Sequence, residues 1–228
     1  MCFRLRTKSS AQLANLKLIS ICAYLTDGDV KWRPEDHRAT KMVKALKGDP
    51  IKGYFSSVVG GVWRKYDQSN VHEFVERIPR ALAGNILRHH DGPATIVPIP
   101  NSHVIATTMA GFKTLDLANK MAEHSGGRFK VAPALVFNEV QQKSRGGGPR
   151  DASHFEKAYR IVQSLTGPII LLDDVCTSGG HLIGAHWRLH CEKSPVVLAC
   201  TFGRSTKEQL ENPVGLREDE LDLSFAAR

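Results

Sequence analysis

An apolar run at residues 168–172 (PIILL) most constrains how this 228-residue chain can fold. Five apolar residues in succession are typical of a strand that is covered on both faces, as in a parallel sheet. Two acids, Asp173 and Asp174, follow at once, and the turn at residues 177–180 (TSGG) leads into a helical pattern over residues 181–190. The sequence therefore predicts a buried strand followed by a turn and a helix, with the two acids at the carboxyl end of the strand, where open α/β sheets bind ligands.

Further strands are predicted at residues 94–99 and 194–201, with a shorter one at 131–136 that Pro133 places toward a sheet edge. Apolar residues at three-to-four spacing predict a helix over residues 112–122, which ends at a Ser-Gly-Gly stop. Strands that alternate with helices imply a parallel α/β sheet with right-handed crossovers.

Outside this region the pattern is less regular. Residues 71–87 have helical spacing that Pro79 interrupts, and residues 12–26 fit either a helix or a strand. We expect three segments: an N-terminal flanking or hood region (1–93), a core (94–202) and a C-terminal extension (203–228). The first and the last are expected to cap the sheet together.

The charge balance favours an anionic partner. Lys and Arg number 31 against 23 Asp and Glu, a net charge of +8, and phosphate in some form is the first candidate. The excess lies mostly before residue 48, whereas acids predominate after residue 207. Because no like-charge block reaches five or six residues, a nucleic-acid-binding tail is not indicated.

The cysteines form no CxxC pair, so neither a disulfide framework nor a zinc knuckle is indicated, and reduced thiols are expected. The first residues lack the pattern of a secretory leader, and about eighteen apolar residues nowhere follow one another. We therefore expect a cytoplasmic protein with no membrane partner. The cysteines are Cys2, Cys22, Cys176, Cys191 and Cys200.

The turn after the acid pair has the chemistry of a phosphate site. Glycines let the backbone approach a phosphate, hydroxyl and N–H groups donate to its oxygens, and the start of a helix favours its charge. Carboxylates repel phosphate, so the natural partners of Asp173 and Asp174 are hydroxyl groups. A sugar phosphate satisfies both demands, with its diol on the acids and its phosphate on the turn.

Residues 169–182 (IILLDDVCTSGGHL) resemble the phosphoribosyl pyrophosphate (PRPP) motif of the type I phosphoribosyltransferases. The resemblance implies a parallel α/β sheet flanked by helices, with a small hood. It also implies that Asp173 and Asp174 are catalytic and hold the ribose 2- and 3-hydroxyls. His181 stands where the family usually has Thr. The implied 5-phosphate site consists of Thr177, Ser178, Gly179, Gly180 and His181.

The wider segment from about residue 96 to 201 looks like the ComF subgroup of that family, without the four-cysteine zinc module of many ComF proteins. Residues 96–101 (IVPIPN) correspond to a strand and loop that bind pyrophosphate, and Gln141 or Gln142, Arg150 and residues 158–159 match further positions. Ala110 replaces a loop arginine, and Lys113 is expected to supply the missing charge.

The resemblance implies transfer of a 5-phosphoribosyl group from PRPP to a nucleobase-like nitrogen acceptor, with release of pyrophosphate. Mg²⁺ is the implied cofactor, held mainly through the substrate, with Asp173 as the candidate protein ligand. The basic loop at residues 138–153 is expected to close over the pyrophosphate. The expected pyrophosphate ligands are Asn101, Ser102, Lys113, Lys143, Arg145 and Arg150.

A second hypothesis assigns the same pocket to a binding module that senses PRPP or a nucleotide and acts on DNA or on a protein partner. The sequence also allows the protein to form a homo-oligomer. Absent GxxxxGK[ST] and GxGxxG patterns argue against other phosphate loops.

The glycine-rich loop alone would be a linker, but its basic flanks and its position favour a functional role. Three other features have a structural interpretation that we favour. His186 and His190 have zinc-like spacing without a third ligand, and Cys176 fits a small buried residue. Residues 63–66, which include Trp63, Arg64 and Tyr66, could form a stacking surface but are expected to pack in the core or hood.

Overall fold

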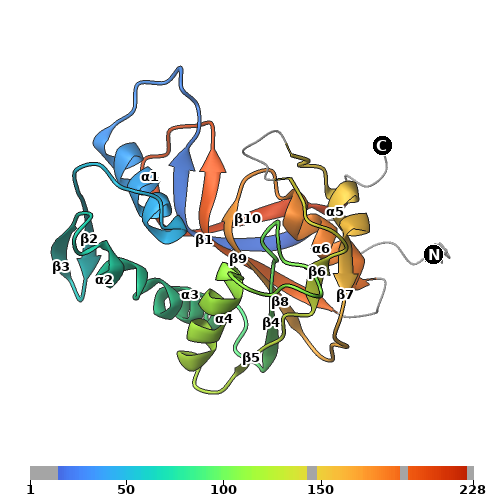
Figure 1. Cartoon of the computed structure of the whole chain (residues 1–228). Helices are drawn as coiled ribbons and strands as arrows, with labels where there is room; N and C mark the ends of the chain where they lie inside the picture. The colour runs from blue at the N-terminus through green and yellow to red at the C-terminus, as the bar shows by residue number, and fades with distance from the viewer. Residues whose placement is uncertain (1–14, 143–147, 191–194, 225–228) are drawn as a thin grey trace.

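The computed structural model describes residues 15–142, 148–190 and 195–224. Its central six-stranded sheet has the order β10-β1-β9-β8-β4-β5 (Figure 1). Neighbours from β1 to β5 are parallel, and β10 pairs antiparallel with β1. The strands are β1 (Asn15–Leu25), β4 (Ala94–Pro98), β5 (Phe129–Val131), β8 (Ile169–Cys176), β9 (Val196–Thr206) and β10 (Val214–Asp222).

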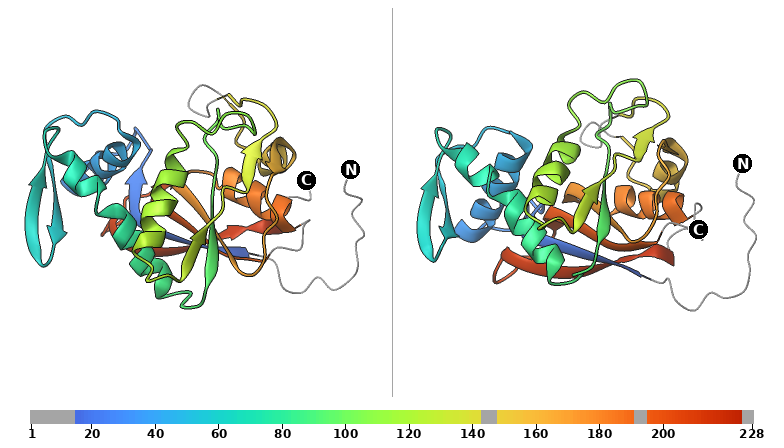
Figure 2. Two further views of the ribbon diagram at one scale, coloured as in Figure 1. Left: turned by 60° about the horizontal axis from the view of Figure 1, so that its bottom comes forward. Right: turned by 90° about the horizontal axis from the view of Figure 1, so that it is seen from below.

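Helices cover both faces of this sheet (Figure 2). One face carries α1 (Pro34–Lys47), α2 (Val71–Val75), α3 (Ile78–Leu87), α4 (Lys113–Glu123) and the hairpin of β2 (Phe55–Val59) and β3 (Val62–Tyr66). The other carries α5 (Ala152–Ala158), α6 (Gly180–His190) and a two-stranded sheet of β6 (Leu135–Phe137) and β7 (Tyr159–Ile161). The prediction of a parallel-dominated α/β sheet flanked by helices is confirmed.

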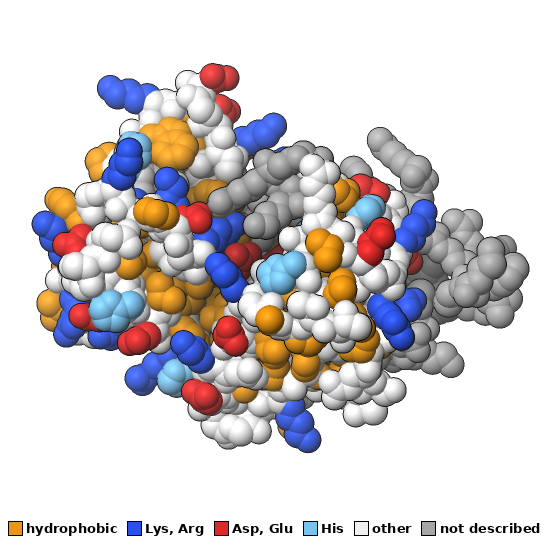
Figure 3. Space-filling view, in the orientation of Figure 1, with side chains coloured by type: hydrophobic (Ala, Val, Ile, Leu, Met, Phe, Trp, Pro, Cys, Tyr) orange, Lys and Arg blue, Asp and Glu red, His pale blue; other side chains and the backbone are white. Residues whose placement is uncertain are grey.

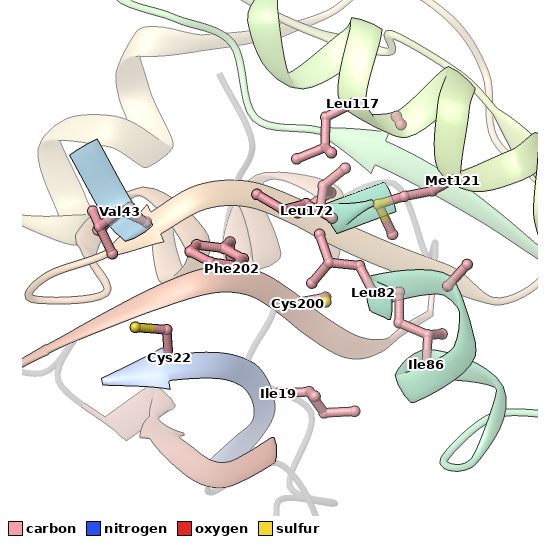
Figure 4. Packing of buried hydrophobic residues seen from close by; sticks show 14 of the residues in the cluster. Ile19, Cys22, Val43, Leu82, Ile86, Leu117, Met121, Leu172, Cys200 and Phe202 are labelled. Atoms are coloured by element: carbon pink, nitrogen blue, oxygen red, sulfur yellow. The ribbon is translucent and has the colours of Figure 1, made fainter. Parts of the chain in front are cut away.

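The alternation of side chains along each strand divides the core in two. Leu172 of β8 packs on the side of α3 and α4, with Leu82 and Met121 among its cluster (Figure 4). Its neighbour Leu171 packs on the side of α5 and α6. Residues 169–172 are all fully buried, which agrees with the strand predicted from the apolar run.

Two strands differ from the expected ones. The single strand expected at 131–136 is two strands, because β5 pairs with β4 whereas β6 pairs with β7 in another sheet. Pro133 lies between them, and β5 is the end strand of the central sheet, which agrees with the expected position toward a sheet edge. Strand β8 continues past the apolar run to Cys176, so Asp173 and Asp174 belong to the strand itself.

The structure also resolves the two ambiguous patterns. Residues 15–25 form strand β1, and residues 71–87 form α2 and α3 with a break at Glu76 and Arg77. Pro79 lies in the first turn of α3 rather than at the break, since a helix tolerates proline there.

The terminal segments contribute more than the expected hood. Strand β1 lies between β9 and β10, so both segments supply strands of the sheet itself (Figure 2). The sheet thus takes strands from all three predicted segments, and their division at residues 94 and 202 stays a prediction. Within the described ranges, no helix has the length and apolar character needed to cross a membrane.

Candidate functional site

The acid pair lies at the carboxyl end of β8, which runs between β9 and β4. Asp173 lies opposite Thr201 of β9, and the N–H of Asp174 donates to Oδ1 of Asp173 at 2.8 Å. Both carboxyl groups line one cleft with a volume of about 490 Å³. The position agrees with the rule that open parallel sheets bind ligands beyond the carboxyl ends of their strands.

The surroundings of Asp173 disfavour its charge. Burial and the neighbouring charge of Asp174 raise the pKa of Asp173 well above its ordinary value, and Lys47 partly opposes this. A cation or a pair of hydroxyl donors brought to the two acids would favour the ionised form. The free protein therefore holds a carboxyl group that a ligand would stabilise as carboxylate.

The turn after β8 encloses a narrow hollow beside the acids. It is formed by residues 175–182 together with Arg150 and Asp173. Gly179 has φ +84°, a conformation that favours glycine, and a Cβ on Gly180 would overlap the carbonyl oxygen of Arg150. Helix α6 begins at Gly180, so its first N–H groups, which have no helical acceptor, lie at this hollow. The hollow can therefore receive an anion from hydroxyl and N–H donors.

Arg204 of β9 supports the turn from the side. Its Nη1 donates to Sγ of Cys176 at 2.9 Å and to the carbonyl oxygen of Thr177. Burial raises the pKa of the Cys176 thiol to about 11, although Arg204 lowers it. Cys176 is thus a small buried side chain and not an activated thiolate.

The loop after β4 forms another wall of the cleft. Oδ1 of Asn101 accepts from the N–H of Lys113 at 2.9 Å, and the carbonyl of Ser102 accepts from the N–H of Gln141 at 2.7 Å. These bonds connect the loop to the start of α4 and to residue 141. Asn101 and Ser102 line the cleft with Gln141 and Arg150.

The structure brings most of the predicted site residues together. The cleft is lined by Asn101, Ser102, Arg150, Asp173, Asp174, Thr177 and His181, and the hollow adds Ser178, Gly179 and Gly180. Lys113 lies beside them, but its Nζ donates to the carbonyl oxygen of Lys47 at 3.0 Å. Lys143 and Arg145 lie outside the described residues. The roles assigned to these residues stay predictions.

Five lining residues were missed by the sequence reasoning: Tyr24, Thr26, Lys47, Phe155 and Ser205. Tyr24 and Thr26 lie at the carboxyl end of β1, and Ser205 lies near that of β9. The rule for parallel strands would have found them if residues 15–25 had been assigned to the sheet. Lys47 ends α1 and gave no signal in the sequence.

Features given a structural interpretation have mixed outcomes. His186 is 4% exposed, and burial, with the nearby charge of His190, lowers its pKa to about 4. The described residues contain no cluster of three or more metal-ligating side chains. Tyr66 packs in the core as expected, but Trp63 is 61% exposed, so core packing was wrong for Trp63. Its ring instead lies under the Arg38 guanidinium at 5.4 Å.

No family model and no curated protein matches the chain. Among solved structures, it is similar to orotate phosphoribosyltransferase from Aeropyrum pernix, with 16% identity, 73% of this chain and 83% of that chain covered, and a TM-score of 0.37. It is also similar to adenine phosphoribosyltransferase from Trypanosoma brucei, with 10% identity, 83% and 87% covered, and a TM-score of 0.37. A third is the purine phosphoribosyltransferase from Pyrococcus horikoshii Ot3, with 16% identity, 58% and 83% covered, and a TM-score of 0.33.

Proposed function

We propose that this protein binds PRPP in the cleft and transfers its 5-phosphoribosyl group to a nitrogen atom of a nucleobase-like acceptor, with release of pyrophosphate. One observation carries this proposal: an anion-receiving hollow and a pair of acids adjoin each other and open into one cleft. A phosphate group and a diol are the ligand groups that match these two surroundings. A sugar phosphate carries both groups in one molecule.

The remaining walls suit the other groups of PRPP. Asn101 and Ser102 offer amide and hydroxyl donors, and Arg150 adds a positive charge on the same cleft. We assign the pyrophosphate to this wall, together with Lys113, Lys143 and Arg145 as the sequence predicts. Guanidinium and ammonium groups there would neutralise charge on the leaving group.

Mg²⁺ fits this cleft as a cation shared with the substrate. Carboxylate oxygens are the protein ligands that it prefers, and it retains water and substrate oxygens around it. Burial and the charge of Asp174 raise the pKa of Asp173, and a cation bound at the acid pair would oppose both effects. When bound, Mg²⁺ would supply positive charge to the pyrophosphate and the ribose hydroxyls, with Asp173 or Asp174 as its carboxylate ligand.

The proposed reaction breaks one bond and forms one bond at C1 of the ribose. The bond from C1 to the pyrophosphate oxygen breaks and its electron pair leaves with the pyrophosphate. The acceptor nitrogen bonds to C1, and the proton on that nitrogen passes to solvent. Asp173 and Asp174 orient the ribose through its hydroxyls and stabilise positive charge that develops on the ring. We assign the acceptor to the part of the cleft lined by Tyr24, Thr26 and Ser205, because the other parts are assigned to PRPP.

The test is pyrophosphate release from PRPP with Mg²⁺ across a panel of nucleobases. We expect Asp173→Asn and Asp174→Asn each to lower the rate by about 100-fold, because each removes charge that stabilises the transition state. Asp91→Asn is the matched control, since Asp91 is exposed in the turn before β4 and lies outside the cleft lining. Release that is unchanged in both cleft variants would contradict the proposal.

The sensing module remains a distinct outcome of the same experiment. Binding of PRPP without turnover, together with a changed affinity for DNA or for a protein partner, would favour the module over the enzyme. Failure to bind PRPP at all would overturn both.

A further inference from the structure

His181 occupies the position where the resemblance places a hydroxyl side chain. It is the second residue of α6 and lines both the hollow and the cleft. A side chain here would meet the 5-phosphate of the proposed substrate. The question is which hydrogen-bonding group it presents.

The imidazole of His181 lies among three aromatic side chains, those of Phe137, Phe155 and Tyr159, and the hydroxyl of Tyr159 contacts it. Its ring lies against Phe155, with ring centroids 3.7 Å apart, and edge-on to Phe137 at 6.2 Å. Nδ1 lies 3.0 Å from the hydroxyl oxygen of Tyr159. Among the described residues, Nε2 has no hydrogen-bond partner, so its edge is the one left to face the cavities that His181 lines.

The ring is neutral in the free protein. Burial lowers the pKa of His181 to about 4, and the charge of nearby His154 acts in the same direction. Burial also raises the pKa of Tyr159, with a smaller contribution from Asp173, so Tyr159 keeps its proton. The pair therefore shares two protons, and their positions decide what Nε2 can do.

Hydrogen-bond satisfaction selects one arrangement. If Nδ1 carried the ring proton, it would donate to Tyr159, and the Tyr159 proton would lack an acceptor among the described residues. Tyr159 is only 1% exposed, and an unsatisfied buried donor is unfavourable. If Tyr159 donates to Nδ1 instead, the Tyr159 hydroxyl and Nδ1 are both satisfied, and the ring proton is on Nε2, at the edge that faces the cavities.

We propose that Tyr159 is a positioning residue that fixes the Nε2–H tautomer of His181, and that this N–H donates to an oxygen of the phosphate bound in the hollow. The second half rests on the proposed function. His181 would then replace the usual hydroxyl with a neutral donor whose direction is set by Phe155 and Tyr159.

The tautomer can be measured in the free protein. Long-range ¹H–¹⁵N spectra distinguish the two neutral forms of a histidine, and loss of the signal in His181→Gln assigns it. We expect the Nε2–H pattern in the wild-type protein and a mixture of tautomers in Tyr159→Phe. An Nδ1–H pattern in the wild-type protein would overturn the proposal.

The donor can be tested by a double-mutant cycle on ribose 5-phosphate binding, measured by calorimetry. Because only part of the Tyr159→Phe molecules keep the Nε2–H tautomer, we expect this variant to weaken binding by about two- to fivefold in the wild-type background. Glutamine places an N–H near the position of Nε2 without needing Tyr159. In the His181→Gln background, Tyr159→Phe should therefore change the affinity less than about twofold.

An equal loss in both backgrounds would mean that Tyr159 acts only through packing, which overturns the proposal. Failure of the wild-type protein to bind ribose 5-phosphate would overturn the proposed function and the phosphate half of this inference. The spectrum of the free protein would still decide the tautomer, so the two failures are distinguishable.

Discussion

Asp173 is a residue whose surroundings oppose the state that its proposed role requires. Burial and the charge of Asp174 raise its pKa, and a carboxyl group whose folded pKa is raised disfavours folding wherever the unfolded chain would ionise it. This cost is absent below the unfolded pKa of about 4 and grows as the pH rises from there. Sites that bind charged ligands often reduce stability in this way.

We therefore expect Asp173→Asn to stabilise the free protein while it lowers the rate of pyrophosphate release about 100-fold. At pH 7 the free energy of unfolding should rise by about 1 kcal/mol, because asparagine carries no charge to bury. Urea unfolding at several pH values measures this gain, which should vanish near pH 3.

Asp91→Asn serves as the comparison, since Asp91 is exposed. If Asp173→Asn were less stable than the wild-type protein at pH 7, the Asp173 carboxylate would have to be stabilised by favourable interactions in the folded protein, which would contradict this prediction.

At the scale of elements, α5 and α6 pack so closely that one glycine is required. A Cβ on Gly184 of α6 would lie 2.7 Å from the carbonyl oxygen of Ala152 and from Cβ of Phe155. Gly84 of α3 is also inside a helix, but a Cβ there would meet nothing within 4 Å. An alanine substitution at Gly84 therefore tests helix propensity alone, whereas the same substitution at Gly184 also tests the packing of α5 against α6.

Gly84→Ala should raise the free energy of unfolding by up to about 1 kcal/mol, because alanine favours the helix. Gly184→Ala should lower it by about 1 to 3 kcal/mol, because α5 must move away. Chemical denaturation of the two variants gives both values. The same sign for both would contradict the packing described here.

Elements also show how far local pattern reaches. The apolar run of β8 and the apolar periodicity of α4 predict those elements well. A strand that is buried on both faces needs consecutive apolar residues, and a helix that is buried on one face needs apolar residues at three-to-four spacing. Strand β1 was ambiguous, because its neighbours β9 and β10 come from the other end of the chain. The split between β5 and β6 depends on separate partners for each half.

At the scale of the whole molecule, Asp36 joins distant parts of the chain. Its Oδ2 accepts from the backbone N–H of Arg33 at 2.9 Å and from Nε2 of Gln209 at 2.9 Å. Gln209 also donates to the carbonyl oxygen of Lys31 at 2.7 Å. The loop before α1 is thus fastened to the loop between β9 and β10.

Hydrogen bonds from Arg33 lower the pKa of Asp36. A carboxyl group with a lowered folded pKa stabilises the fold above its unfolded pKa of about 4, and this contribution is lost as the pH falls through the folded pKa. Asp36→Asn should therefore lower the free energy of unfolding at pH 7 by about 2 kcal/mol. Urea unfolding should show the difference shrinking below pH 4, and a difference independent of pH would contradict a role of the charge.

The net charge of +8 is also a property of the whole surface. Lys and Arg side chains are spread over the face in Figure 3 and are interspersed with acids. The Nζ of Lys113 is engaged by the end of α1, whereas Lys47 and Arg150 line the cleft. Of the cations that the sequence selected, Arg150 thus lines the cleft, whereas Lys47 was not among those selected.

The sequence by itself determined the chemistry of one strand and one turn. Residues 169–182 are contiguous, so their apolar run, acids and glycines specify a strand, a glycine turn and a helix without help from elsewhere. Only the tertiary structure decided what faces this turn. Lys47, Tyr24, Arg204 and Tyr159 come from segments far apart in the chain. Their approach depends on strand order and on packing between elements, which no local pattern records.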